Sequence, residues 1–219
     1  SGDEQWIYEN PETRLLDVKR ENSGPAMGGD GPRSTPVIHG DFVYALGATG
    51  VLDCLRWRTG EKVWSRNIIS EFPGDVQKWG SANSVLIIAE EGLVVVPGSD
   101  QPGATLIAFD LESGEDRWTY AGNGASYSSP RIIEIAGVRK LVSVNRHDVT
   151  AHDPASGEVL WKYDWKGNLP KVGQPILAGE NQILVTASYG VGSPLLEVTQ
   201  SDEGNWTVDE LWNSIRLKT

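Results

Sequence analysis

The feature that most constrains the fold is an eleven-residue pattern that recurs along the chain. Residues 108–118 read A-F-D-L-E-S-G-E-D-R-W, and residues 151–161 read A-H-D-P-A-S-G-E-V-L-W, so both fit A-x-D-x-x-S-G-E-x-x-W. Residues 54–64, C-L-R-W-R-T-G-E-K-V-W, form a third copy in which Cys54 and Arg56 replace the alanine and the aspartate. Self-similarity of this kind predicts a repeat architecture.

The segments around these copies read as short β-strands separated by tight turns. They form four cycles of four strands each. The first cycle has strands at 35–39, 42–47, 51–57 and 62–67, and the second has strands at 84–90, 93–97, 104–110 and 116–121. The third has strands at 129–136, 139–145, 149–153 and 159–165, and the fourth has strands at 174–178, 182–189, 195–199 and 206–213. No window shows a convincing helical period. Four antiparallel strands in each period of about 40–50 residues are typical of a β-propeller blade. We therefore predict an all-β chain of about four four-stranded blades.

The blade limits follow from the spacing of the tryptophans that close each cycle. Residues 1–33 are expected to hold the end strand of a preceding blade, at 5–9, and a loop. The repeats then span 34–67, 68–121, 122–165 and, in degenerate form, 166–219. The sequence begins and ends at the same phase, near Trp6 and Trp212, so four repeats either close as a small ring or form a piece of a larger one. The second alternative is preferred, with an eight-bladed homodimer or further sequence completing the ring.

The recurring pattern has a structural interpretation. The aspartate ends one strand and can accept N–H groups of the following turn, where the glycine is free to adopt positive φ. The tryptophan is a large flat side chain that can stack on the neighbouring blade, and the alanine leaves room for a flat contact. The positions predicted to hold blades together are Trp64, Ala108, Asp110, Gly114, Trp118, Ala151, Asp153, Gly157 and Trp161.

Composition excludes several classes of function. The 219 residues carry 19 basic and 30 acidic side chains, a net charge of −11, which disfavours a nucleic-acid partner. No apolar run approaches the roughly 20 residues that a membrane helix needs. Cys54 is the only cysteine, which rules out an internal disulfide and favours a small buried side chain. The opening residues carry no signal peptide, and the abrupt start suggests a mature or excised fragment.

The repeated A-x-D-x-x-[ST]-G-x-x-x-W resembles the tryptophan-docking repeat of the PQQ-like (pyrroloquinoline quinone) β-propellers, from about residue 34 to residue 212. That group includes quinoprotein alcohol dehydrogenases, an outer-membrane assembly lipoprotein and repeat proteins of environmental bacteria, which this chain resembles most. The dehydrogenases of the group use a vicinal cysteine pair, calcium ligands and a catalytic aspartate. The cysteine pair is impossible here, and no residue lies in a motif that assigns the other roles. No cofactor is therefore predicted, and PQQ with calcium is the alternative.

Binding residues are expected where the innermost strands begin, since these line a propeller's central channel. The candidates are Arg33, Ser34, Trp79, Asn83, Tyr127, Ser128 and Gln174. Hydroxyls and amides there suit a polar ligand. The alternative is that small residues begin these strands because space near the axis is limited.

Other motifs give little support for catalysis. Asp148, Thr150 and His152 fall on one face of a strand, but no third ligand stands at a metal spacing, and Arg146 to Asp148 also read as a hairpin turn. No metal site and no catalytic residue is predicted. The leading interpretation is a non-catalytic periplasmic or secreted scaffold that binds a protein or a small polar ligand. The alternative is a segment of a PQQ-dependent dehydrogenase whose cofactor ligands lie outside this chain.

Overall fold

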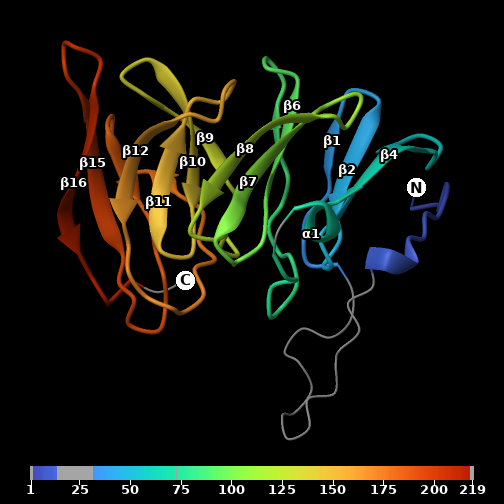
Figure 1. Cartoon of the computed structure of the whole chain (residues 1–219), viewed down its shortest axis with the longest axis horizontal. Coiled ribbons are helices and arrows are strands. Elements are labelled where there is room, and N and C mark those ends of the chain that lie inside the picture. The colour runs from blue at the N-terminus through green and yellow to red at the C-terminus, as the bar shows by residue number, and fades with distance from the viewer. Residues whose placement is uncertain (1, 14–31, 73, 218–219) are drawn as a thin grey trace, which may run out of the picture.

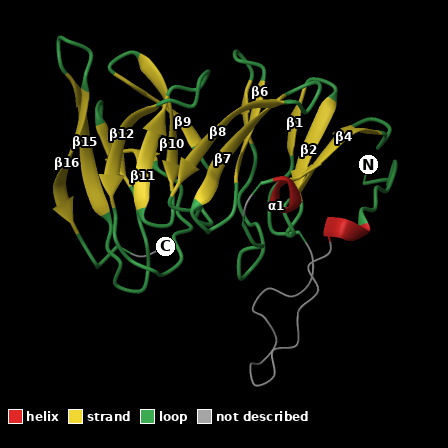
Figure 2. Cartoon of the chain, in the orientation of Figure 1, coloured by secondary structure: helices red, strands yellow, loops and turns green. Residues whose placement is uncertain are grey.

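The computed structural model describes residues 2–13, 32–72 and 74–217, and it is built almost entirely of strands (Figures 1 and 2). The first two sheets contain β1 (Val37–His39), β2 (Phe42–Leu46), β3 (Val51–Arg56) and β4 (Lys62–Asn67), then β5 (Leu86–Ile88), β6 (Leu93–Pro97), β7 (Gly103–Asp110) and β8 (Asp116–Gly122). The last two contain β9 (Arg131–Ile135), β10 (Val138–Val144), β11 (Asp148–His152) and β12 (Val159–Asp164), then β13 (Ile176–Leu177), β14 (Gln182–Leu184), β15 (Pro194–Gln200) and β16 (Trp206–Asn213).

Each sheet pairs four consecutive strands in antiparallel order, which confirms the predicted all-β fold of four-stranded units. The described helices are the 3₁₀ turn η1 (Pro11–Thr13) and the four-residue α1 (Ile68–Glu71). Neither is long and apolar enough to cross a membrane. No strand forms between residues 2 and 10, which differs from the strand expected at 5–9. Most of the loop expected after it, 14–31, lies outside the described residues.

The four sheets stand side by side in chain order (Figure 1). The first sheet and residues 2–13 lie at one end of the row and β16 lies at the other, so the described chain forms an open row. Three apolar clusters fill the spaces between successive sheets. Middle strands such as β6 are buried along their whole length because both faces meet a neighbouring sheet, whereas outer strands such as β8 alternate between exposed and half-buried residues.

A tryptophan from each of the first two sheets lies on a glycine turn of the next. The indole of Trp118 covers Gly157 and donates its Nε1–H to the carbonyl of Pro154 at 3.2 Å. Trp64 makes the same contact with Gly114 in the second sheet. Both glycines have positive φ, 74° and 72°, and a Cβ atom on either would stand within 2.7 Å of the ring. Glycine is therefore required at these turns for both conformation and space.

The N-terminal segment makes the equivalent contact with the first sheet. Trp6 lies on Gly60, and its Nε1–H donates to the carbonyl of Trp57 at 2.8 Å. Close by, the Tyr8 hydroxyl and the Asn10 amide hydrogen-bond the buried carboxylate of Asp53. This segment thus packs against β3 and the turns of the first sheet without forming a ladder with it.

The aspartates of the two complete copies organise the turns that present these glycines. Asp110 Oδ1 accepts the N–H groups of Glu112 and Ser113 at 3.0 and 2.9 Å, and Asp153 bonds its own turn in the same way. The backbone hydrogen bond from Ser113 is the main cause that lowers the pKa of Asp110. Ala108 and Ala151, which are predicted to hold blades together, are fully buried in β7 and β11 and pair across the ladder with Trp118 and Trp161.

The contact between the third and fourth sheets is made differently. Trp161 is buried, but its Nε1 has no hydrogen-bond partner in the described part of the chain, and no glycine turn lies under its ring. Instead, the fully buried Lys140 places its Nζ 3.6 Å from the ring centre of Trp206. The same ammonium donates to the carbonyls of Ile135 and Val138, which flank the β9–β10 turn.

Replacement of Gly157 by alanine tests the indole-on-glycine contact. The new methyl would overlap the Trp118 ring, so we expect the free energy of unfolding to fall by about 1–3 kcal/mol more than in Gly137→Ala. Gly137 has a similar φ of 71°, and no atom lies within 4 Å of the position that a Cβ would take there, so it isolates the backbone strain. Urea unfolding followed by circular dichroism measures both variants, and equal losses would contradict the contact's importance.

Candidate functional site

The segments that enter the innermost strands form a line of hydrogen bonds from sheet to sheet. The hydroxyl of Ser84 accepts the N–H of Thr35 at 3.1 Å, and the hydroxyl of Ser129 accepts the N–H of Ser84 at 2.8 Å. Each sheet therefore supplies the acceptor for the sheet before it. We call this line of contacts the inner seam.

Three of the predicted binding residues lie in the inner seam. Asn83 and Ser128 are buried: Asn83 Nδ2 donates to two carbonyls of the 126–128 segment at 2.6 and 3.0 Å, and the Ser128 hydroxyl donates to Gly173 O at 2.9 Å. Ser34 donates to Ser81 O at 3.4 Å and lines a cavity against the first sheet. Their donor groups are bonded to neighbouring segments, whereas Asn83 Oδ1 is buried and has no hydrogen-bond partner in the described part of the chain. Gln174 is exposed and lines none of the three cavities that the other candidates border.

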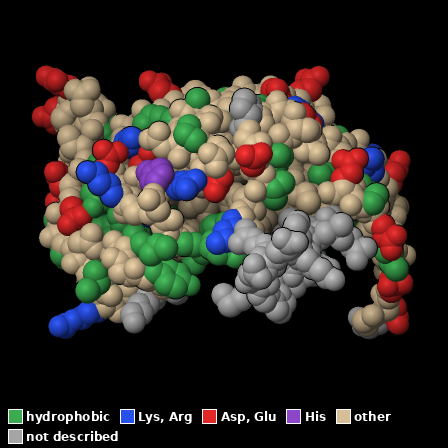
Figure 3. Space-filling model, turned by 60° about the horizontal axis from the view of Figure 1, so that its bottom comes forward, with side chains coloured by type: hydrophobic (Ala, Val, Ile, Leu, Met, Phe, Trp, Pro, Cys, Tyr) green, Lys and Arg blue, Asp and Glu red, His purple; other side chains and the backbone are tan. Residues whose placement is uncertain are grey.

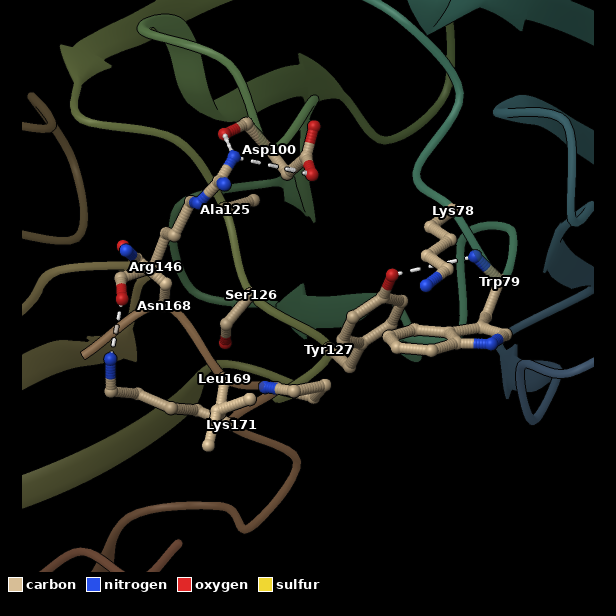
Figure 4. A pocket seen from close by; sticks show the side chains of 11 residues that line it. Lys78, Trp79, Asp100, Ala125, Ser126, Tyr127, Arg146, Asn168, Leu169 and Lys171 are labelled. Atoms are coloured by element: carbon tan, nitrogen blue, oxygen red, sulfur yellow. Dashed lines mark hydrogen bonds and ion pairs between the residues drawn. The ribbon is translucent and has the colours of Figure 1, made fainter. Parts of the chain in front are cut away.

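The other three predicted residues, Arg33, Trp79 and Tyr127, come together around a cavity of about 460 Å³. Trp79 and Tyr127 also line a neighbouring cavity of about 240 Å³ at the same end of the sheets (Figure 4). We call the two cavities together the loop-end pocket. The smaller one is lined by Lys78, Trp79, Asp100, Ala125, Ser126, Tyr127, Arg146, Asn168, Leu169, Pro170 and Lys171.

Segments that lead into all four sheets build this pocket, with Arg33 preceding the first sheet. Trp79 lies in the connection before β5 and Tyr127 in the connection before β9, and their ring centres are 5.6 Å apart. The Tyr127 hydroxyl accepts the N–H of Trp79 at 3.4 Å. Burial is the main cause that raises the pKa of Tyr127, so its hydroxyl stays protonated near neutral pH. Lys78 stands over the Trp79 ring at 4.7 Å. Two half-buried rings thus form one wall of the pocket.

The opposite wall carries charge. Arg146, in the β10–β11 turn, donates to the backbone carbonyl of Asp100 at 3.0 Å and lies 3.4 Å from its carboxylate. Lys171 is 1% exposed and donates to the carbonyl of Arg146 (Figure 4) and to that of Gly167. Burial lowers the pKa of Lys171 to about 8. The residues around the pocket therefore include four cations, Arg33 among them, and one carboxylate.

Sequence reasoning missed Lys78, Asp100, Arg146 and Lys171. A signal for two of them was present, because in a four-stranded antiparallel unit the turn between the second and third strands lies at the same end as the connection to the next unit. Asp100 and Arg146 occupy such turns. Nothing in the local sequence distinguishes Lys171 from an exposed lysine.

The histidine and aspartate cluster of the third sheet is a structural network. His152 is fully buried; its Nδ1–H donates to Gly157 O at 2.9 Å, and Nε2 contacts the Thr150 hydroxyl at 2.8 Å. Burial lowers the pKa of His152, so the ring is neutral. Asp148 is also buried and accepts from Asn145 at 2.7 Å. His152 thus fixes the turn that carries Gly157. The described residues contain no group of three His, Cys, Asp or Glu side chains that could hold a metal ion.

Comparison with known proteins supports the fold and leaves the activity open. A family model described as "Outer membrane protein assembly factor BamB" matches residues 1–215. The chain is 24% identical over 145 residues to the quinohemoprotein alcohol dehydrogenase of Comamonas testosteroni, covering 61% of this chain and 20% of the relative. It is 26% identical over 134 residues to BamB of Burkholderia pseudomallei (strain K96243), covering 48% of this chain and 34% of the relative.

Solved structures show the same fold. The crystal structure of BamB from Moraxella catarrhalis superposes with a TM-score of 0.57 at 17% identity, over 85% of this chain and 62% of that one. The alignments span about a fifth and a third of the length of the two curated relatives. The predicted resemblance to PQQ-like propellers is thus confirmed.

Replacement of Asn83 by alanine tests the inner seam. It would leave the carbonyl of Ser126 with only the 3.4 Å bond from Gln77 Nε2 and would remove the donor to the carbonyl of Ser128, so we expect a loss of about 1–3 kcal/mol in the free energy of unfolding. Gln174→Ala, in the exposed segment that leads into the fourth sheet, is the control and should change stability by less than about 0.5 kcal/mol. Thermal unfolding measures the stability of both variants. A loss for Asn83→Ala as small as that for Gln174→Ala would contradict a structural role of Asn83.

Replacement of Lys171 by methionine tests its burial. Because the pKa of Lys171 in the folded protein lies below the ordinary value of 10.5, its positive charge lowers the free energy of unfolding, and below pH 8 this loss is fully present. The loss declines as the pH rises from about 8 to 10.5. We therefore expect wild-type stability, relative to Lys171→Met, to increase between pH 7 and pH 9.5. Chemical unfolding at both pH values measures it, with exposed Lys166→Met as control; a pH-independent difference would contradict the burial.

Proposed function

The chain belongs to the PQQ-repeat β-propeller family whose model is described as outer membrane protein assembly factor BamB, and on this premise we propose that it is a non-catalytic binding scaffold of the cell envelope. The loop-end pocket is its binding site. A segment of a partner protein is the preferred occupant, and a small polar ligand with the same anionic chemistry is the other source. The observation that carries the proposal is the meeting of Trp79, Tyr127 and four cationic side chains at one end of the four sheets.

The composition of the pocket supports an anionic occupant. A chain of net charge −11 repels anions at long range, yet this pocket concentrates cations with a single carboxylate among its lining residues. Aromatic rings contribute apolar contact area at little conformational cost, and tryptophan, tyrosine and arginine are enriched at protein interfaces. An extended acidic segment with an apolar or aromatic side chain could contact the two rings with that side chain and the cationic side chains with its carboxylates.

PQQ with calcium, the cofactor pair of the alternative function, finds no fitting donor set among the described residues. Cys54 is the only cysteine of the sequence and is buried beside Tyr44 and Trp64, and burial raises the pKa of its thiol to about 11. The described residues contain no group of three His, Cys, Asp or Glu side chains, so they offer no carboxylate cluster of the kind that binds calcium. The same chain can be dialysed against PQQ and Ca²⁺; stoichiometric quinone absorbance with alcohol-dependent dye reduction would favour the dehydrogenase instead.

Binding of a fluorescein-labelled acidic peptide, Glu-Tyr-Glu-Phe-Glu, tests the scaffold proposal. Fluorescence anisotropy should show at least about tenfold tighter binding than for Lys-Tyr-Lys-Phe-Lys, with an affinity that falls as salt rises. Trp79→Ala should weaken binding about tenfold or more, and Lys78→Ala a few fold.

The chain offers matched controls for these variants. Arg58 stands 4.2 Å from the ring centre of Trp57, the same cation-on-indole arrangement at a different surface. Arg58→Ala should leave peptide affinity unchanged. Free glutamate and succinate distinguish a small-anion site from a peptide site. Equal binding of both peptides, or equal effects of Lys78→Ala and Arg58→Ala, would argue against the pocket.

A further inference from the structure

The turn between β14 and β15 carries a residue type that its backbone conformation disfavours. The N–H of Val191 donates to the carbonyl of Ser188 at 3.3 Å and closes a four-residue turn. Its two central residues, Tyr189 and Gly190, have φ of 60° and 77°. Positive φ at both central positions is the mark of a type I′ turn, where Asn-Gly, Asp-Gly and Gly-Gly are preferred. A Cβ atom makes this conformation unfavourable, so tyrosine is a poor choice at the first position.

The β9–β10 turn offers a comparison within the same chain. In the described part of the chain, Ala136 and Tyr189 are the residues other than glycine with positive φ, and Ala136 also precedes a glycine of positive φ, Gly137. Ala136 is exposed and lines none of the cavities described above, whereas Tyr189 lines the larger cavity of the loop-end pocket. A strained residue at a candidate binding surface is a reason to seek a function for its side chain.

Tyr189 contributes a third ring to that cavity. Trp79 and Tyr127 line it from the connections before β5 and β9, so the three rings come from three different sheets. Figure 3 brings this end of the sheets forward and shows hydrophobic side chains gathered next to lysine and arginine side chains. The remaining lining residues of the larger cavity are Arg33, Ala82, Ser129, Pro170 and Val172.

The fold itself gains little from the Tyr189 ring. The side chain is 72% exposed, and it belongs to none of the three apolar clusters that fill the spaces between the sheets. A side chain outside the core, on a backbone that disfavours it, is not explained by stability. Its position in the lining of the cavity is the remaining explanation.

The charges around the cavity determine what kind of molecule carries a group into it. The two cavities of the loop-end pocket share Trp79, Tyr127 and Pro170, so they adjoin each other. The larger one has Arg33 as its one charged lining residue, and the smaller one has three cations and one carboxylate. An apolar group in the larger cavity therefore lies close to cations, which suits a group that is flanked by carboxylates.

We propose that the larger cavity is a subsite for one aromatic side chain of an acidic partner segment, and that Tyr189 determines this specificity. The inference rests on the proposed function and specifies which side chain the pocket selects. Aromatic rings attract one another in edge-to-face and offset-stacked arrangements beyond the effect of their buried area. Three rings from three sheets offer such contacts to a flat aromatic group and not to an aliphatic one. The disfavoured turn residue is explained by the ring that it presents.

Three fluorescein-labelled peptides test the subsite by fluorescence anisotropy. They are Glu-Ala-Glu-Phe-Glu, the same peptide with cyclohexylalanine in place of phenylalanine, and Glu-Ala-Glu-Ala-Glu. Cyclohexylalanine has a similar size but no aromatic face. We expect the phenylalanine peptide to bind about threefold or more tightly than the cyclohexylalanine peptide, and the alanine peptide to bind most weakly.

Replacement of Tyr189 separates binding from folding. Tyr189→Asn should weaken binding of the phenylalanine peptide about fivefold to tenfold, and it should raise the thermal midpoint by about 2–4 °C because asparagine tolerates the left-handed conformation. Tyr189→Phe should keep the wild-type affinity. Ala136→Asn is the matched control: it makes the same change of turn residue, should also raise the midpoint, and should leave the affinity unchanged.

Two sets of results would contradict the subsite. Equal affinity for the phenylalanine and cyclohexylalanine peptides, or equal affinity of the wild type and Tyr189→Asn, overturns it while the binding of acidic peptides, and with it the scaffold proposal, stands. Failure of every acidic peptide to bind overturns both.

Discussion

The structure depends on the contact between an indole face and a glycine turn. It connects Trp6 to the first sheet, the first sheet to the second and the second to the third, each time with a glycine of φ near 72° to 74°. A single four-stranded sheet has apolar side chains on both faces and cannot bury them alone. Stacking in a row solves this problem, and the flat contact at the outer edge fixes the spacing at which middle strands such as β6 become fully buried.

The inner ends of the sheets obey a different constraint, which determines where a ligand can bind. Strands converge there, and small polar side chains such as Asn83 and Ser128 donate hydrogen bonds to the segment that leads into the next sheet. Side chains that reach past this seam come from the longer connections, which carry Trp79, Tyr127 and Lys171. Aromatic and cationic side chains therefore contribute to the lining of the pocket alongside Ser126 and Ser129.

The sequence predicts most of the fold because the residues that define it act locally. Alternation, turn glycines and the aspartate-to-turn bonds of Asp110 lie within a few residues of each other, so the pattern predicts the strands to within a few residues. Contacts between residues that are far apart in the sequence are harder to predict from it. Lys140 looks like an ordinary strand lysine, and only its placement on Trp206 explains its burial. The pocket is half predictable: Trp79 and Tyr127 stand beside strand starts, whereas Lys171 becomes part of it through burial that no pattern reveals.

Charge explains why the pocket and the rest of the surface have different tasks. With thirty acidic and nineteen basic side chains, the chain repels other anionic surfaces. Salt screens this repulsion over the Debye length of about 8–10 Å. Inside that distance the local cations dominate. Asp100 neutralises Arg146 only in part, since the same guanidinium also bonds a backbone carbonyl. Lys171 has carbonyls but no carboxylate among its hydrogen-bond partners in the described part of the chain. The buried carboxylate of Asp148 acts electrostatically on Lys171 and offsets part of the effect of burial on its pKa. An anionic group entering the pocket would add a second negative charge close to Lys171 and Arg146.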